Sequence, residues 1–256
     1  MEQHLPSGDG AQPELTLVIP THNSELVIEK SLAAAAARLV DLPSEIVLVE
    51  NGSTDDTRQI LDRVVADWPA GGPSLRVLTV PKGLGNALRA GIMASRGRTV
   101  MITADDLPFG FDELDQAQRL GLATHPVVIG SKAHPDSEIG RSVVRTLLTG
   151  GHRLLRRAAL GMRVADPQGT YVLLGDWARA VAPALRESGF LYTTELAYAA
   201  TLAGLEPVEV PVRLRQSAHR TRVRVSDIWR MGVGLIGIRR RRAALTAALR
   251  DSDTLG

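Results

Sequence analysis

The chain has 256 residues, 44% of them hydrophobic and 23% charged, a composition typical of a globular enzyme with one large domain or two small ones. The lack of cysteine excludes disulfides, thiol nucleophiles and zinc–thiolate sites, and no apolar run approaches the ~18 residues of a membrane span. The formal net charge is +2, and Arg supplies most of the positive charge; Arg suits phosphate recognition, although codon bias would give the same composition. Residues 1–13 lack the apolar stretch of a signal peptide and are expected to form a disordered leader.

Apolar runs alternate with helical segments in the first half of the chain. Ser53 is expected to cap the second helix, with Asp56 at the capping-box position and Asp55 adding negative charge to the first turn. In chain order we predict a strand at 15–20, a helix at about 23–40, a strand at 46–50, a helix at about 53–68, a strand at 75–80, a helix at 83–95 and a strand at 99–103.

The second half continues the same α/β pattern. The alternation predicts one doubly wound, mostly parallel sheet with helices on both faces, in a single domain over residues 14–225. Residues 226–256 are expected to form a C-terminal amphipathic basic helix and tail. The further elements predicted are a strand at 126–131, a basic helix at about 139–160, a strand at 170–174, helices at about 176–186 and 193–203, a strand at 206–214, an Arg-rich loop at 213–224 and a last helix from 226 to about 249.

Polar residues follow each of the first four predicted strands. In a doubly wound sheet, ligands bind at the carboxyl ends of the strands, so these four loops are expected to converge. One such loop is weak, whereas four in register favour a single nucleotide-type site. The loops are Thr21-His22-Asn23, Asn51-Gly52-Ser53, Lys82-Gly83-Leu84-Gly85 and Ala104-Asp105-Asp106.

The order and spacing of six segments resemble glycosyltransferase family 2. The resemblance covers about residues 15–242 and is strongest to the branch of dolichyl- and polyprenyl-phosphate sugar synthases, in particular to those that transfer glucose to dolichyl phosphate. The segments are VIPTHN (18–23), VENGSTDDT (49–57), KGLGNALRAGIMASRG (82–97), GSKAHPDSEIGRSVVRTLLTGGHRLL (130–155), DPQGTY (166–171) and GFLYTTELAYAA (189–200).

The resemblance implies a GT-A fold, a nucleotide-diphospho-sugar donor, Mg²⁺ or Mn²⁺ and an inverting single displacement. The family's D-x-D segment falls on residues 104–106. Asp106 takes the last position, the usual metal ligand, whereas Ala104 replaces the first Asp, and Asp105 is expected to substitute for it. The alternative is that Asp105 and Asp106 cap the next turn.

The resemblance also implies the donor-binding residues. Asn51 could accept a hydrogen bond from a pyrimidine N–H through its amide oxygen, which favours a UDP-sugar without excluding GDP. Ser24 stands where the family often has Glu, and the neighbouring Glu25 is a candidate to replace it. Lys82 and the backbone amides near Gly83 and Gly85 are expected to meet phosphate. The full predicted donor set is Pro20, Thr21, His22, Asn23, Glu50, Asn51, Gly52, Lys82, Gly83 and Asp105.

The acceptor is expected to be anionic, with polyprenyl phosphate as the main candidate. Arg141 and Arg145 are four residues apart and so share a helix face. A phosphate monoester is largely dianionic at neutral pH and needs no general base, and the chain shows no compelling base. The resemblance implies that basic residues grip the acceptor phosphate, and it assigns Asp106, Arg141 and Arg145 to catalysis. The predicted acceptor-binding set is Lys132, Arg141, Arg145, Gln168, Glu195 and Arg222.

The last predicted helix has apolar residues three or four apart, namely Ile228, Met231, Leu235 and Ile238, followed by residues 239–242, all Arg. It is either an interfacial helix with a basic end or a helix packed on its own domain. We therefore expect a cytoplasmic protein with peripheral contact to the inner face of the membrane, no nucleic-acid partner and an undetermined oligomeric state. Three alternatives stay open: an enzyme of this fold with a soluble acceptor, a nucleotide-sugar-binding protein without turnover, and a sugar nucleotidyltransferase, which the basic acceptor helix disfavours.

Overall fold

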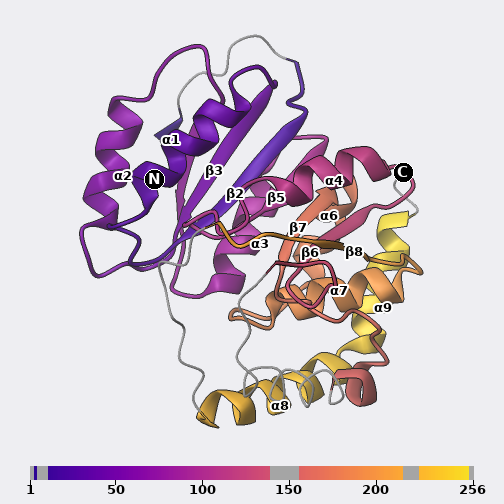
Figure 1. Ribbon diagram of the computed structural model, residues 1–256. Coiled ribbons are helices and arrows are strands. Elements are labelled where there is room, and N and C mark those ends of the chain that lie inside the picture. Colours follow the sequence, from indigo (N-terminus) through magenta and orange to yellow (C-terminus); the bar gives the residue numbers. More distant parts are fainter. Residues whose placement is uncertain (1–2, 5–10, 139–155, 216–224, 254–256) are drawn as a thin grey trace.

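The computed structural model describes residues 3–4, 11–138, 156–215 and 225–253. Eight strands of the described residues form one sheet in the order β1-β4-β3-β2-β5-β7-β6-β8 (Figure 1). The strands are β1 (Gln3–His4), β2 (Leu15–Thr21), β3 (Ser44–Glu50), β4 (Ser74–Thr79), β5 (Thr99–Ile102), β6 (Val127–Ser131), β7 (Thr170–Leu174) and β8 (Val208–Pro211).

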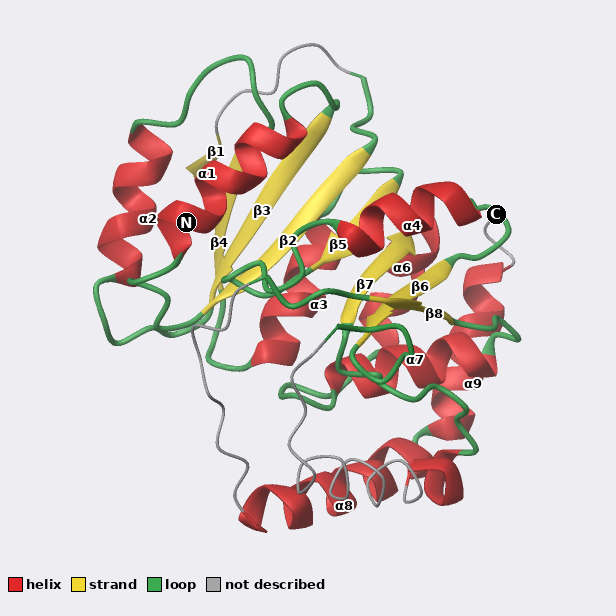
Figure 2. Ribbon diagram, in the orientation of Figure 1, coloured by secondary structure: helices red, strands yellow, loops and turns green. Residues whose placement is uncertain are grey.

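Helices cover both faces of this sheet, as Figure 2 shows. The face that carries Leu17 and Ile19 packs against α1, α2 and α4, and the opposite face packs against α3, α6, α7 and α9. This layering confirms the predicted α/β class with helices on both faces. The helices are α1 (Ile28–Leu39), α2 (Thr57–Ala66), α3 (Leu84–Ala94), α4 (Asp112–Leu120), α6 (Gly175–Val181), the short 3-10 helix η1 (Ala182–Ala184), α7 (Tyr192–Leu202), α8 (Val225–Arg240) and α9 (Arg242–Asp253).

The burial of strand β2 on both faces explains why its segment is apolar without alternation. It pairs in parallel with both β3 and β5, and all seven of its residues are buried. Leu17 and Ile19 face α1, while Val18 faces α3. A side chain at Gly91 of α3 would place its Cβ 2.4 Å from Cγ1 of Val18, so only glycine allows the helix to lie this close to the sheet.

Strand β7 runs antiparallel to both of its neighbours, β5 and β6, so the sheet is mixed although mostly parallel. Its register pairs Tyr171 with Ile102 and Thr170 with Gly130. Because β7 is reversed, its first residues lie beside the last residues of β5 and β6. The loops that precede β7 and follow β5 and β6 therefore meet at one edge of the sheet.

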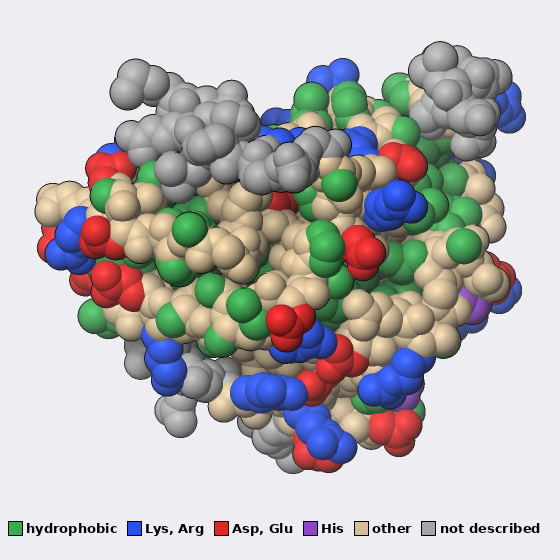
Figure 3. Space-filling view, turned by 90° about the horizontal axis from the view of Figure 1, so that it is seen from above, with side chains coloured by type: hydrophobic (Ala, Val, Ile, Leu, Met, Phe, Trp, Pro, Cys, Tyr) green, Lys and Arg blue, Asp and Glu red, His purple; other side chains and the backbone are tan. Residues whose placement is uncertain are grey.

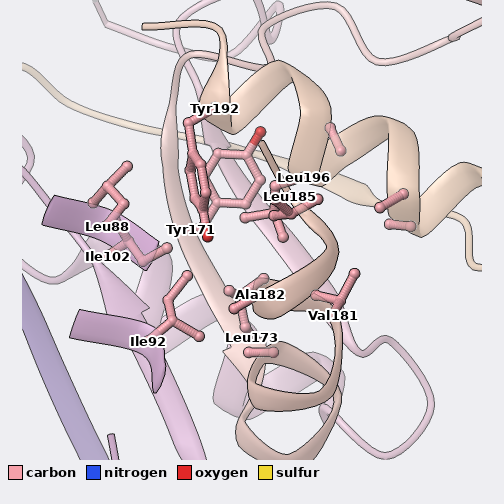
Figure 4. Close-up of a cluster of buried hydrophobic side chains, with 14 of the residues drawn as sticks. Leu88, Ile92, Ile102, Tyr171, Leu173, Val181, Ala182, Leu185, Tyr192 and Leu196 are labelled. Atoms are coloured by element: carbon pink, nitrogen blue, oxygen red, sulfur yellow. The ribbon is translucent and has the colours of Figure 1, made fainter. Parts of the chain in front are cut away.

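A cluster of buried side chains joins the second half of the chain to α3 (Figure 4). Tyr171 of β7 and Tyr192 of α7 are fully buried in it, together with Leu88 of α3. The Tyr171 hydroxyl lies 2.6 Å from the carbonyl oxygen of Pro167 and 2.9 Å from that of Thr193. These contacts fix the loop before β7 against the start of α7.

Two helices begin later than predicted. The helix expected from residue 23 begins at Ile28, because Asn23 adopts the left-handed region with φ 55°. The helix expected from residue 53 begins at Thr57, and Ser53 is not its cap. The Ser53 hydroxyl instead accepts a hydrogen bond from the Asn23 backbone N–H at 3.1 Å, whereas Asp55 accepts one from the Thr57 N–H at 3.1 Å.

Helix α4 was not predicted, and the last predicted helix is divided into α8 and α9 at Arg241. Leu235, Ile238, Leu245 and Leu249 are buried, so these two helices pack on their own domain along that face. Val233 and Ile236 of α8 are about half exposed. No helix among the described residues is both long and apolar enough to cross a membrane. The predicted basic helix falls mostly on residues 139–155, which lie outside the described residues.

The surface seen from above in Figure 3 carries acidic and basic side chains close together. This mixture is in keeping with the nearly balanced formal charge of the chain. The coloured residues of this view show no extended patch of one sign.

Candidate active site

The carboxyl ends of β2, β3, β4 and β5 lie in register at one edge of the sheet. Backbone hydrogen bonds join them beyond the last strand residues: Asn51 N–H donates to the Thr21 oxygen at 3.1 Å, and Val80 N–H donates to the Glu50 oxygen at 2.9 Å. Thr103 N–H donates to the Val18 oxygen at 3.2 Å. The four polar loops predicted from the sequence are therefore brought together.

Asn51 joins three of these loops. Its side chain is buried; the Nδ2 group donates to the Thr21 carbonyl at 2.8 Å, and Oδ1 accepts from the Gly83 N–H at 3.3 Å. The oxygen expected to accept a base N–H is thus engaged by the protein. Asn51 therefore holds the loops after β2, β3 and β4 together from within.

Glu50 has a similar supporting position. Its buried carboxylate accepts a hydrogen bond from the Ser53 N–H at 2.5 Å and pairs with Arg58 at 2.5 Å. Gly52 has φ 79°, and a Cβ there would lie 3.2 Å from Cβ of Lys82, so the loops after β3 and β4 touch. The Lys82 side chain is exposed at this contact.

Several polar atoms at the ends of β2 and β5 face no protein partner. Within the described part of the chain, the buried Oγ1 atoms of Thr21 and Thr103 and the buried Nδ1 of His22 have no hydrogen-bond partner. Leaving a buried polar atom unpaired costs about 1–3 kcal/mol. Such a group is expected at the floor of a ligand site. Pro20 is buried near the end of β2, and Asn23 is exposed in the loop that follows, where its Oδ1 accepts from the Thr54 N–H at 2.8 Å.

Asp105 and Asp106 lie in the turn after β5, and both are half-buried. The Ser24 hydroxyl donates to the Asp105 carboxylate. Oγ of Ser24 also accepts a hydrogen bond from the His22 N–H at 3.1 Å. Ser24 therefore orients Asp105, while Glu25 accepts from the Asp56 N–H before the start of α2 at 3.1 Å.

The fit of a divalent cation rests on these two carboxylates. The described residues contain no group of three or more His, Cys, Asp or Glu side chains that could hold a metal ion. Mg²⁺ commonly binds through one or two carboxylates together with substrate phosphates, and an Asp pair at this edge of the sheet suits that mode.

Gly83 and Gly85 serve close packing. Gly83 has φ 142°, and a Cβ there would lie 2.4 Å from the Ser188 oxygen; at Gly85 it would lie 2.2 Å from the Glu187 oxygen. The Gly85 N–H donates to the Ser188 oxygen at 2.8 Å. Both glycine N–H groups are thus bonded within the protein. Of the groups in this loop predicted to bind phosphate, the Lys82 side chain stays exposed.

The predicted acceptor residues divide into described and undescribed ones. Lys132 follows β6, and its backbone N–H donates to the Asp166 carboxylate at 2.9 Å; Gln168 is exposed in the turn before β7. The antiparallel β7 thus brings both residues to the edge that carries Asp106. Arg141, Arg145 and Arg222 lie outside the described residues.

Glu195 is fully buried in α7. One carboxylate oxygen accepts from the backbone N–H groups of Arg186 and Glu187 at 2.8 and 2.7 Å, and the other accepts from Nη2 of Arg241 at 2.9 Å. Glu195 was predicted to bind the acceptor, but both of its carboxylate oxygens are bonded within the protein, where they orient Arg241.

Glu113 of α4 was missed by the sequence reasoning. Its carboxyl is fully buried within the described part of the chain. Burial raises the pKa of Glu113 to about 7, although hydrogen bonds from its own backbone N–H and from the Thr170 side chain lower it. The charge of Asp112 raises this pKa further, and Arg215 opposes that increase. Nothing in the sequence separates Glu113 from its less buried acidic neighbours Asp112 and Asp115, so only the packing of α4 on the sheet reveals it.

Comparison with known proteins agrees with this geometry. Residues 16–173 match the family model described as "Glycosyl transferase family 2", and the chain belongs to that family of glycosyltransferases. The chain is 26% identical over 240 positions to a dolichyl-phosphate β-glucosyltransferase of Trichomonas vaginalis, covering 87% of this chain and 70% of the relative. It is also 26% identical over 272 aligned positions to the dolichyl-phosphate β-glucosyltransferase of Homo sapiens, covering 99% and 83%.

Solved structures confirm the predicted GT-A fold. The crystal structure of glucosyl-3-phosphoglycerate synthase from M. tuberculosis superposes with a TM-score of 0.60 at 22% identity, covering 90% of this chain and 80% of that one. At this identity the likeness concerns the fold.

Proposed function

We propose that this enzyme transfers a glucose-like hexose from a UDP-sugar to polyprenyl or dolichyl phosphate, with inversion at the anomeric carbon. The observation that carries the proposal is the convergence of the β2, β3 and β4 loops with the Asp105–Asp106 turn at one edge of the sheet. The relatives named as dolichyl-phosphate β-glucosyltransferases support the acceptor and the sugar.

The chain's own residues divide the work between donor and acceptor. Thr21 and His22 offer unpaired polar atoms to the nucleotide, and Lys82 is exposed for the diphosphate. Asp105 and Asp106 would hold Mg²⁺ or Mn²⁺, which neutralises charge on the leaving diphosphate when bound. A phosphate acceptor is already a nucleophile, so the site needs no general base.

A direct transfer assay tests this proposal. Purified protein is incubated with UDP- and GDP-sugars, a short polyprenyl phosphate and Mg²⁺, Mn²⁺ or EDTA, and products are read by mass spectrometry. We expect a lipid-linked sugar phosphate that disappears with EDTA. Asp106→Asn is expected to reduce its formation by at least about 100-fold, since the metal contact is worth several kcal/mol. The matched control Asp62→Asn, on the exposed side of α2, should act like the wild type. Full activity of Asp106→Asn, or activity in EDTA, would contradict the metal assignment.

A second candidate function replaces the lipid with a soluble phosphate acceptor. The observation in its favour is that Leu235 and Ile238 of α8 are buried on the protein's own domain. Release of UDP with small phosphorylated acceptors, together with no product on polyprenyl phosphate, would select this candidate. Peripheral contact with the inner face of the cytoplasmic membrane belongs to the first candidate, and co-sedimentation with anionic vesicles tests it.

A further inference from the structure

The donor loop, residues 82–86, is supported by the segment of residues 185–191 that joins η1 to α7. The contact is made by backbone atoms: the Ser188 oxygen accepts from the Gly85 N–H at 2.8 Å, and the Glu187 oxygen lies where a Cβ at Gly85 would clash. Because no flexible side chain lies between them, a shift of the supporting segment displaces the donor loop directly.

The supporting segment is held from its other side by a charge network in which Glu195 is buried and Arg241 is partly buried. The Glu195 carboxylate accepts from the backbone N–H groups of Arg186 and Glu187. Its second oxygen accepts from Arg241, at 3.2 Å from Nε and 2.9 Å from Nη2. Arg241 also pairs with the Glu187 carboxylate. One guanidinium therefore joins the buried anchor to the segment itself.

Arg241 stands at the break between α8 and α9, where the chain turns. Earlier in α8, Gly234 lies against the end of the same segment, since a Cβ there would be 2.1 Å from Cδ1 of Leu191. Leu235 and Ile238 are buried beside this contact. The α8–α9 junction thus touches the supporting segment at two points, and the far side of that segment carries the donor loop.

We propose that Arg241 is a positioning residue for the donor site, and that the seating of the α8–α9 junction sets donor affinity through residues 185–191. The identity of the donor follows the proposed function, but the mechanical coupling does not depend on it. Arg241 is distant in sequence from the nucleotide motifs and acts on the donor through Glu187 and Glu195.

The test compares Arg241→Met with Arg241→Lys and with Arg240→Met, the adjacent exposed arginine. Calorimetry measures UDP binding, steady-state kinetics measures KM for the UDP-sugar against kcat, and hydrogen exchange reads the amides of Gly85 and Asn86. We expect Arg241→Met to raise Kd and KM about 5- to 20-fold, the lower part of the usual range for coupled sites, with kcat nearly unchanged. Exchange at both amides should become faster even without nucleotide. Arg241→Lys should restore part of the affinity, and Arg240→Met should leave all three readouts unchanged.

Wild-type UDP affinity and unchanged exchange in Arg241→Met would overturn the proposal. If that variant fails to fold, Glu187→Gln weakens one arm of the same network and should give a smaller change in the same direction; no change there would also overturn it. A wild-type protein that binds no nucleotide contradicts the proposed function, whereas the exchange measurement still decides the coupling.

Discussion

Replacing Glu113 with Gln is expected to remove most of one pH dependence of stability. The carboxyl has its pKa raised to about 7 by burial, against an ordinary value of 4.5. Between these two values the folded protein keeps a proton that the unfolded chain has lost, so the free energy of unfolding falls as the pH rises. At 1.36 kcal/mol per pH unit, the total loss is about 3 kcal/mol, complete above about pH 7.

Urea unfolding at pH 5 to 8.5 measures this effect in the wild type and in Glu113→Gln. The variant should lose less stability with rising pH and exceed the wild type by up to about 3 kcal/mol at pH 8, because its side chain never ionises. Glu14→Gln, an exposed position, serves as the matched control and should parallel the wild type. Parallel curves for wild type and Glu113→Gln would refute the reasoning, since a buried carboxyl with an elevated pKa must give a slope in this window.

Two further substitutions test the packing of the loop after β4 and the ion pair at the start of β3. Gly85→Ala would place a Cβ 2.2 Å from the Glu187 oxygen. Thermal melts should therefore show a loss of about 1–3 kcal/mol of stability, and UDP titration should show weaker binding. The control Gly72→Ala, where the added Cβ would meet open space, should change neither. Glu45→Gln should lower the free energy of unfolding at pH 7 by about 3–5 kcal/mol, because it leaves the buried Arg76 without its carboxylate at 2.9 Å. Burial raises the pKa of Glu45, but hydrogen bonds and Arg76 lower it more, so the deficit of this variant should persist above pH 4.5 and shrink as the pH falls further; a constant deficit would argue against the ion pair.

The strands were predictable because burial on both faces leaves a direct mark on the sequence. The segment of β2 is apolar at nearly every position since Leu17 and Val18 face different helix layers. The helix starts were less predictable. The first turn before α1 depends on the left-handed Asn23 and on a hydrogen bond from the Ser24 N–H to the Thr57 hydroxyl at 2.7 Å, and both are tertiary effects.

The location of the site could be predicted, whereas the partner of each side chain could not. Strand ends in a parallel sheet meet at one edge, so the four loops and Asp106 were placed together from spacing alone. The role of Asn51 in holding the loops together could not be predicted, because its partner Gly83 follows a different strand. The contact between Glu195 and Arg241 could not be predicted either, because the two residues are 46 positions apart in the chain.

The position of β7 has a consequence for how the protein is made. β5 and β6 never pair with each other; β7 lies between them, and it is the later strand in the chain. While a ribosome is still making residue 170, β5 and the β6 edge that β7 will occupy have unpaired backbone groups, and such edges invite pairing between chains. The nascent domain should therefore be most prone to aggregation just before β7 emerges, and truncated chains that end before Leu174 should need a chaperone to stay in solution.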